Sequence, residues 1–153
     1  MRMSLEELLD APGRLERQLW EARLDTQAIW ESCFRLVSRY DGMGRSGGFA
    51  DARDGQSAAL ADARDEEGRL QERLEKSCRE LEGLIDRVER IWGPREAMVL
   101  RWRYLLRQPW NRAQQEAERA FGRKVTLRTL HNWHRAAILH ARELVEGEQE
   151  KAS

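Results

Sequence analysis

The chain has 153 residues, of which 41% are hydrophobic and 35% are charged, and its 27 basic and 27 acidic residues give a formal net charge of zero. This length fits one domain, or a small domain with an extension. Three prolines in all, together with many Leu, Glu, Arg and Ala residues, predict an all-α protein, and no stretch alternates as a strand would.

The N-terminal stretch MRMSLEELLDAPGRLERQ is charged and lacks the apolar core of a signal peptide. No apolar run approaches the length of a membrane span. We therefore expect a cytoplasmic protein with no membrane association. Cys33 and Cys78 have no metal-ligand spacing, so reduced, packed thiols are expected.

Charge is distributed unevenly along the chain. Residues 1–89 carry 14 basic and 20 acidic side chains, residues 90–142 carry 12 basic and 3 acidic ones, and residues 143–153 carry 1 basic and 4 acidic ones. The balances are −6, +9 and −3. A basic block between acidic segments indicates an anionic partner, unless the acidic half folds back and neutralises it.

Residues 4–40 have a helical pattern. Ser4 and Glu7 have the spacing of a capping box. Proline lacks the N–H group of a helix interior, so Ala11-Pro12-Gly13 predicts a break, with a short first helix and a long one from about Arg14. Apolar and small residues recur in alternating steps of four and three, the heptad pattern of a coiled coil: Leu8, Pro12, Leu15, Leu19, Ala22, Thr26, Ile29, Cys33, Leu36 and Tyr40.

Residues 41–57 are predicted to form a Gly-rich loop. Their GMGRSGG stretch lacks the Gly-Lys-Ser/Thr ending of a phosphate-binding loop, so a connector is the simpler interpretation. Residues 58–91 again predict a heptad helix, with the positions Leu60, Ala63, Glu67, Leu70, Leu74, Ser77, Leu81, Leu84, Val88 and Ile91. Two such helices favour an antiparallel hairpin over residues 1–92, and a homodimer through this region stays open.

Residues 93–146 predict a helix-turn-helix domain, and residues 147–153 an acidic tail. Gly93-Pro94 starts a helix that Arg107-Gln108-Pro109 ends. A second helix opens at Trp110 or Asn111 and ends at Gly122. Thr126 then caps a third helix from Leu127 to about Val145, whose expected packing side is Leu130, Trp133, Ala137, Ala141 and Leu144.

The opposite side of the third helix carries donors that suit base edges in the major groove of DNA. Arginine can fork onto guanine and asparagine can pair with adenine. We expect Arg128, His131, Asn132 and Arg135 to face bases. We expect Arg112, Arg123, Lys124 and Thr126 to hold phosphates.

The three histidines suggest a metal site, but the pattern is incomplete. His131 and His134 share a face, whereas His140 lies about half a turn of the helix away. Residues 90–142 hold no Cys, Ser or Asp to complete a zinc site or a catalytic triad. We therefore expect no metal, no cofactor and no enzymatic activity, with His134 half-buried beside Trp133.

Two patterns in the basic block resemble sigma factor region 4. Pro94-Arg95-Glu96, Val99-Leu100 and Arg103-Tyr104 resemble its first helix, and residues 126–136, TLRTLHNWHRA, resemble its recognition helix. Across most of the chain, the heptad region, the Gly-rich connector and this C-terminal pattern resemble small phage regulators of the ArpU/RinA type. No segment resembles region 2, and the stretch from Trp110 to Thr126 is longer than in the usual module.

The resemblance implies a phage or prophage transcription regulator whose partners are double-stranded promoter DNA and host RNA polymerase. Two other functions would fit a chain with a helix-turn-helix and long helices. One is a small terminase-like DNA packaging subunit, although such proteins usually place the DNA-binding part first. The other is a helical adaptor that binds protein and not DNA.

Overall fold

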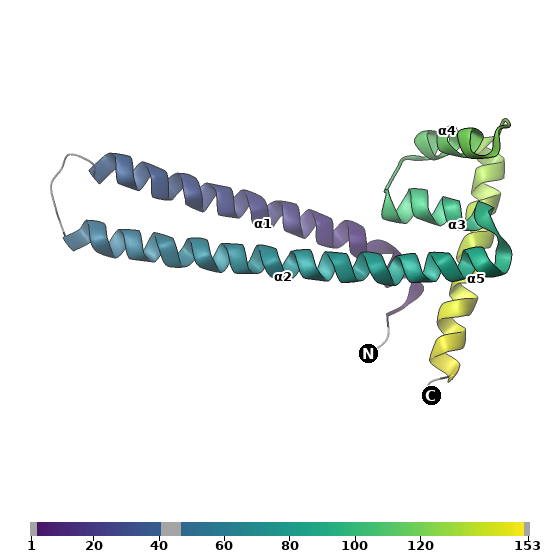
Figure 1. Ribbon diagram of the computed structural model, residues 1–153, viewed down its shortest axis with the longest axis horizontal. Coiled ribbons are helices and arrows are strands. Elements are labelled where there is room, and N and C mark those ends of the chain that lie inside the picture. The colour runs from purple at the N-terminus through teal and green to yellow at the C-terminus, as the bar shows by residue number, and fades with distance from the viewer. Residues whose placement is uncertain (1–2, 41–46, 152–153) are drawn as a thin grey trace. The chain divides into compact units, whose positions relative to one another are not determined.

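The computed structural model describes residues 3–40 and 47–151, and every element in these ranges is helical. In chain order the elements are α1 (Leu5–Tyr40), α2 (Gly47–Trp92), α3 (Pro94–Leu100), a π-helical turn η1 (Arg101–Leu105), α4 (Trp110–Phe121) and α5 (Leu127–Lys151) (Figure 1). The all-α prediction is confirmed. No helix in the described ranges is long and apolar enough to cross a bilayer.

The chain divides into two compact units. Unit 2 is the contiguous stretch 15–74, and unit 1 combines residues 1–14 with residues 75–153. This division differs from the expected boundary after residue 92, because the last turns of α2 pack with the C-terminal helices and not with the rest of the hairpin.

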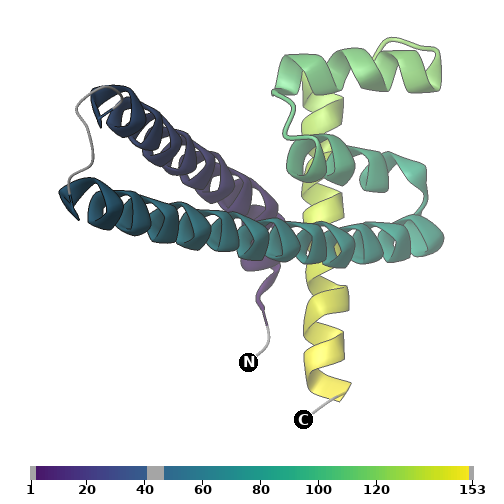
Figure 2. The same cartoon turned by 60° about the vertical axis from the view of Figure 1, so that its left-hand side comes forward.

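Unit 2 is an antiparallel pair of helical segments from α1 and α2 (Figures 1 and 2). Leu15, Leu19 and Leu70 are buried, and the other described heptad positions of this unit are half-buried. Arg23 donates a hydrogen bond to Gln71 across the pair, and Cys33 lies 3.6 Å from Gln56 between sulfur and oxygen. The heptad pattern therefore predicted the contact between the two helices.

Helix α1 begins as expected and then continues where a break was predicted. The Glu7 amide donates to the Ser4 hydroxyl and the Ser4 amide donates to the Glu7 carboxylate, which forms the capping box. The predicted break at Pro12 is wrong: α1 runs unbroken from Leu5 to Tyr40. Proline removes one hydrogen bond to the Leu8 carbonyl, and the complete burial of Pro12 in the core offsets this local cost.

The predicted loop at 41–57 is too long. Residues 41–46 lie outside the described residues, and α2 already begins at Gly47, so positions 47–57 are helical. Ala50 and Ala52 favour the helix here, although the stretch also contains Gly47, Gly48 and Gly55. The contact between Gln56 and Cys33 also fixes this part of α2 against α1.

The core of unit 1 consists of two clusters that meet at α3. The first cluster joins the start of α1, the end of α2, α3 and the C-terminal half of α5 through Leu5, Leu9, Leu81, Leu84, Ile85, Val88, Ala97, Leu100, Ala137, Ala141 and Val145. The second cluster joins α3, η1, α4 and the N-terminal half of α5 through Val99, Trp102, Ala113, Ala117, Val125 and Leu130. Full burial of a large aliphatic side chain such as Ile85 or Leu130 contributes about 1.5–3 kcal/mol.

Helix α5 runs crosswise to both α3 and α4 in the two ribbon views (Figures 1 and 2). Its expected packing side is correct, since Leu130, Ala137 and Ala141 are fully buried and Trp133 and Leu144 are half-buried. The helix is longer than predicted, because residues 147–151 of the expected tail continue it to Lys151. Gln149 donates to the Met3 carbonyl and Glu148 pairs with Arg87, so this last turn has partners within unit 1.

Candidate nucleic-acid interface

The turn between α4 and α5 positions the candidate site. Helix α4 ends at Phe121, and the next residue, Gly122, adopts the left-handed conformation with φ 61°, as predicted for the residue after a helix. The Gln114 side chain donates to the Val125 carbonyl at 2.8 Å, and Val125 is buried. These contacts fix residues 122–126 between the two helices.

Thr126 caps α5 as predicted. Its hydroxyl accepts a hydrogen bond from the Thr129 amide at 3.1 Å and shares another with the Thr129 hydroxyl at 3.0 Å. The hydroxyl of Thr126 is thus used for capping the N-terminus of α5. A phosphate near Thr126 would therefore be bound by the free backbone N–H groups of the first turn of α5. These groups lie at the positive end of the helix dipole, which attracts anions.

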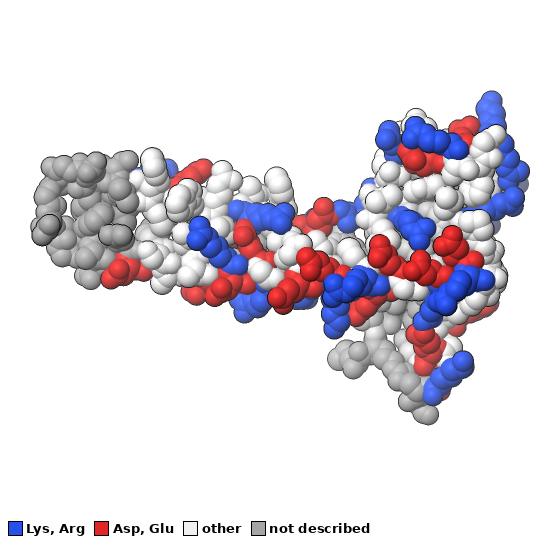
Figure 3. All heavy atoms as spheres, in the orientation of Figure 1, with Lys and Arg blue, Asp and Glu red and all other residues white. Residues whose placement is uncertain are grey.

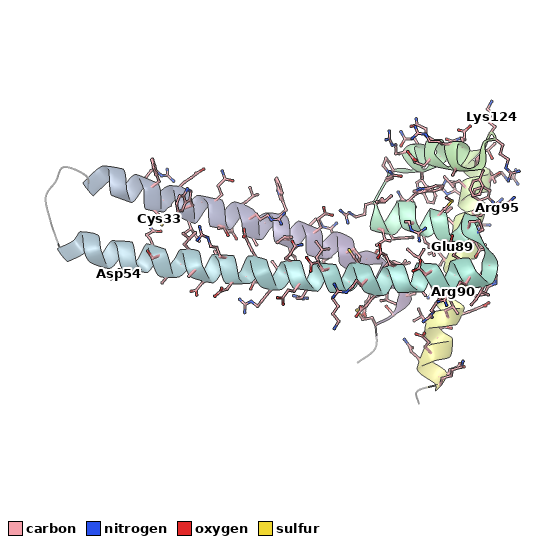
Figure 4. The ribbon with its side chains drawn as sticks, viewed as in Figure 1. Cys33, Asp54, Glu89, Arg90, Arg95 and Lys124 are labelled. Atoms are coloured by element: carbon pink, nitrogen blue, oxygen red, sulfur yellow. The ribbon has the colours of Figure 1, made fainter. Side chains whose placement is uncertain are left out.

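All eight predicted site residues are exposed in the structure. Arg128, His131, Asn132 and Arg135 lie on one face of α5 at steps of three and four, within its first three turns. Directly before them, Arg123 and Lys124 occupy the turn, and Figure 4 shows Lys124 at its outer edge. The structure therefore places seven of the eight residues in one continuous segment of exposed surface.

Arg112 lies apart from the turn, near the start of α4. Its guanidinium is 3.8 Å from the Glu116 carboxylate, which also pairs with Arg119 at 3.6 Å. Trp110, two residues earlier, has its ring 4.2 Å from that of His131 and 5.1 Å from that of His134. The start of α4 therefore lies beside the middle of the candidate α5 face, which keeps Arg112 near it.

The site is strongly and locally basic. Residues 119–142 contain no Asp or Glu. Within the described part of the chain, no carboxylate pairs with Arg123, Lys124, Arg128 or Arg135. In the space-filling view, Lys and Arg side chains gather over α4 and the turn that follows it (Figure 3).

Among the described residues, the acidic segments form ion pairs with cations on the other side of the basic block. Arg101 pairs with Asp86 of α2, and Arg142 pairs with Glu6 of α1 at 2.6 Å. Both pairs involve cations outside the candidate face. Folding back of the acidic segments therefore explains part of the +9 charge and leaves the α5 face and the turn uncompensated.

His134 has a structural position beneath this face. Its Nε2 atom lies 2.8 Å from the Tyr104 hydroxyl, and its ring meets Trp110 edge-on. Burial lowers the pKa of His134 from its ordinary value, and the nearby Arg103 and His131 act in the same direction. Burial also raises the pKa of Tyr104. The half-buried position expected for His134 is confirmed.

His140 lies on a different part of α5. Its ring stacks on Trp92 with centroids 4.1 Å apart, and its Nδ1 atom is 2.5 Å from the Glu96 carboxylate. The three histidines therefore have separate environments. Within residues 3–40 and 47–151, no three His, Cys, Asp or Glu side chains gather as metal ligands would, and both Cys33 and Cys78 are free thiols.

Sequence reasoning missed the residues that hold the site in place. Arg103 donates to the Gln108 carbonyl at 2.6 Å and its guanidinium lies 4.4 Å above the Trp110 ring, which then contacts His131. Arg95, labelled in Figure 4, lies over the Trp133 ring at 5.4 Å. The sequence signal was present, since tryptophans and arginines alternate in this block, but it does not indicate which arginine meets which ring.

In comparisons with known proteins, no protein-family model, curated protein or solved structure matches this chain.

Proposed function

We propose that the protein is a sequence-specific regulator of transcription that binds double-stranded DNA through a helix-turn-helix formed by α4 and α5. The observation that carries the proposal is the exposed, uncompensated basic face of α5 directly after a basic turn. In a helix-turn-helix the second helix packs by one side and presents donors near its N-terminal end to the major groove. Leu130 and Ala137 pack, and Arg128 and Asn132 face outward.

The proposed roles follow from side-chain chemistry. Arg128 and Arg135 would fork onto guanine, Asn132 would pair with adenine, and His131 would donate or accept at a base edge. Arg112, Arg123, Lys124 and the amides after Thr126 would bind phosphate on either side of the groove. Phage origin and a contact with RNA polymerase belong to the same proposal and rest on the resemblance to sigma factor region 4.

The first experiment measures fluorescence anisotropy of the full chain on a randomised duplex pool over a salt series, with sequencing of the bound fraction. We expect a steep salt dependence and one enriched motif, since phosphate contacts release counterions while base contacts select sequence. Steep dependence without enrichment would favour the packaging subunit, for which light scattering would then show a ring-sized oligomer. No binding at low salt would overturn the proposal and favour an adaptor.

On the enriched motif, Arg128→Ala and Asn132→Ala should each cost about 1–3 kcal/mol of binding free energy and relax the base preference at one position. Lys124→Ala should weaken binding to all sequences and reduce the salt slope by about one. Arg79→Ala, an exposed arginine of α2 outside the site, is the matched control and should change neither quantity. Unchanged affinity and selectivity in both α5 variants would refute the assignment of this face.

A further inference from the structure

Helix α1 carries a second exposed surface, and it is apolar. In unit 2, Trp20, Leu24, Trp30 and Phe34 are 63%, 48%, 54% and 67% exposed. Their steps along the helix place them on one side, away from the side on which Leu15 and Leu19 are buried. We call these four residues the α1 stripe. Three large aromatic side chains exposed on one helix face are unusual for a surface that faces only water.

A shallow groove and three charged residues, Arg23, Glu31 and Arg35, lie along the stripe. Gln27, Trp30, Glu31, Phe34 and Arg35 line the groove. Gln27 lies at the middle of the stripe and donates to Glu31 at 3.2 Å. Arg23, between Trp20 and Leu24 on the same face, bonds only a neutral amide, that of Gln71, and within the described residues neither Arg23 nor Glu31 forms an ion pair.

We propose that the α1 stripe is an antiparallel interface with a second copy of this chain, with the two-fold axis at Gln27. Antiparallel pairing about that residue places each residue opposite the one equally far on the other side of position 27. Trp20 then faces Phe34 of the second copy, and Leu24 faces its Trp30. Arg23 faces Glu31 of the second copy, so the two unpaired charges become a pair, twice, by symmetry.

The alternatives satisfy fewer of these groups. A parallel pair would place Arg23 against Arg23 and Glu31 against Glu31, which repel. In the antiparallel pair, Trp20 and Leu24 of one copy enter the groove between Trp30 and Phe34 of the other. The polar Gln27 at the centre of an apolar seam would then fix the register, as buried polar positions do in coiled coils.

The apolar side chains of the stripe supply about half the area of a standard interface. Aromatic side chains bury 150–250 Å² each, so the exposed parts of these four residues would bury roughly 400–500 Å² per copy. A standard interface buries about 800 Å² per partner, with a polar rim around an apolar centre. The charged and amide groups beside the stripe supply that rim. The proposal concerns unit 2 alone and does not depend on the proposed function.

The test is analytical ultracentrifugation of the full chain, without DNA, over a wide concentration range. We expect a monomer–dimer equilibrium whose dissociation constant rises at least tenfold in Trp30→Glu. Leu139→Glu, at a residue that is 57% exposed on α5, is the matched control and should leave the equilibrium unchanged. A chain that stays monomeric at every concentration would overturn the proposal, as would a dimer that Trp30→Glu leaves intact.

A charge-reversal cycle tests the antiparallel register. Arg23→Glu and Glu31→Arg should each weaken the dimer about fivefold or more, and the double variant should recover most of the loss, because its charges again face opposite ones. Circular dichroism melts of each variant check that unit 2 remains folded. Single reversals that leave the dissociation constant unchanged would refute this register and point to a different partner for the stripe. The same holds if the loss of dimerisation free energy in the double variant equals the sum of the losses in the two single variants.

Discussion

At the scale of single residues, His134 connects the proposed DNA-binding face to the core beneath it. It is half-buried, hydrogen-bonded to Tyr104, and in edge contact with Trp110, which in turn contacts His131. Burial favours the neutral imidazole and lowers the pKa of His134. The protonation state of this residue therefore affects the stability of the layer that supports the face.

The lowered pKa predicts a pH dependence with a definite sign. Below about pH 6.5 the unfolded state binds the His134 proton more readily than the folded state does, so stability falls as the pH falls through this window and is retained above it. Thermal unfolding at pH 8 and pH 5.5 measures this difference. His134→Gln should reduce the difference between the two melting temperatures, whereas Asn132→Gln, at an exposed position of the same helix that does not titrate, is the control. A difference that is as large in His134→Gln as in the parent would contradict the assignment.

At the scale of helices and turns, local signals predicted termini well. Ser4 with Glu7, Thr126 and Gly122 all lie where the capping patterns put them, because a cap depends on residues three or four positions away. The exposure of Arg128 and its neighbours on α5 followed from the same short-range periodicity. Residues within one or two helical turns are sufficient to predict these caps and this exposed face.

Features that depend on distant contacts were not predictable. Pro12 is accommodated because the core buries it, and the start of α2 is helical partly because Gln56 meets Cys33. Helix α5 extends to Lys151 since its last turn meets Met3 and Arg87. In each case the deciding partner is more than twenty residues away in the sequence, where helix patterns carry no information.

The turn before α5 gives a prediction at this scale. Gly122 has φ 61° and open space around its Cβ position, so Gly122→Ala adds only backbone strain, which should destabilise the protein by about 1–2 kcal/mol. Gly83→Ala is the matched control, because Gly83 also has open space but lies inside helix α2. This variant should stabilise by about 0.5–1 kcal/mol. Chemical denaturation measures both, and the same sign for both would refute the argument.

At the scale of the whole molecule, unit 1 combines both ends of the described chain. Leu5 and Leu9 share a core cluster with Ala141 and Val145, and Arg142 pairs with Glu6. The proposed DNA-binding face thus belongs to a unit whose core includes the first turns of α1. Its stability depends on residues that lie more than one hundred positions earlier in the sequence.

This dependence predicts the effect of Leu5→Ala. Leu5 is 2% exposed, so its truncation should cost about 2–5 kcal/mol of stability. Leu106→Ala, at a leucine of the same unit that is 57% exposed, should stay within about 0.5 kcal/mol of the parent. DNA binding by Leu5→Ala should be normal well below its reduced melting temperature, whereas Arg128→Ala should bind weakly at every temperature. Equal stability of Leu5→Ala and the parent would show that this cluster contributes little.

The discontinuous composition of unit 1 also determines an order of events during synthesis. Residues 15–74 are contiguous, so unit 2 contains all its own contacts as soon as that stretch has left the ribosome. Residues 5–14 have to wait for α5, which is made much later, before their core is complete. Contacts over such separations are slow to form. On the ribosome, Leu5 and Leu9 would therefore stay incompletely buried until α5 has been made, and a chain that stops short of α5 would leave their cluster without Ala137, Ala141 and Val145.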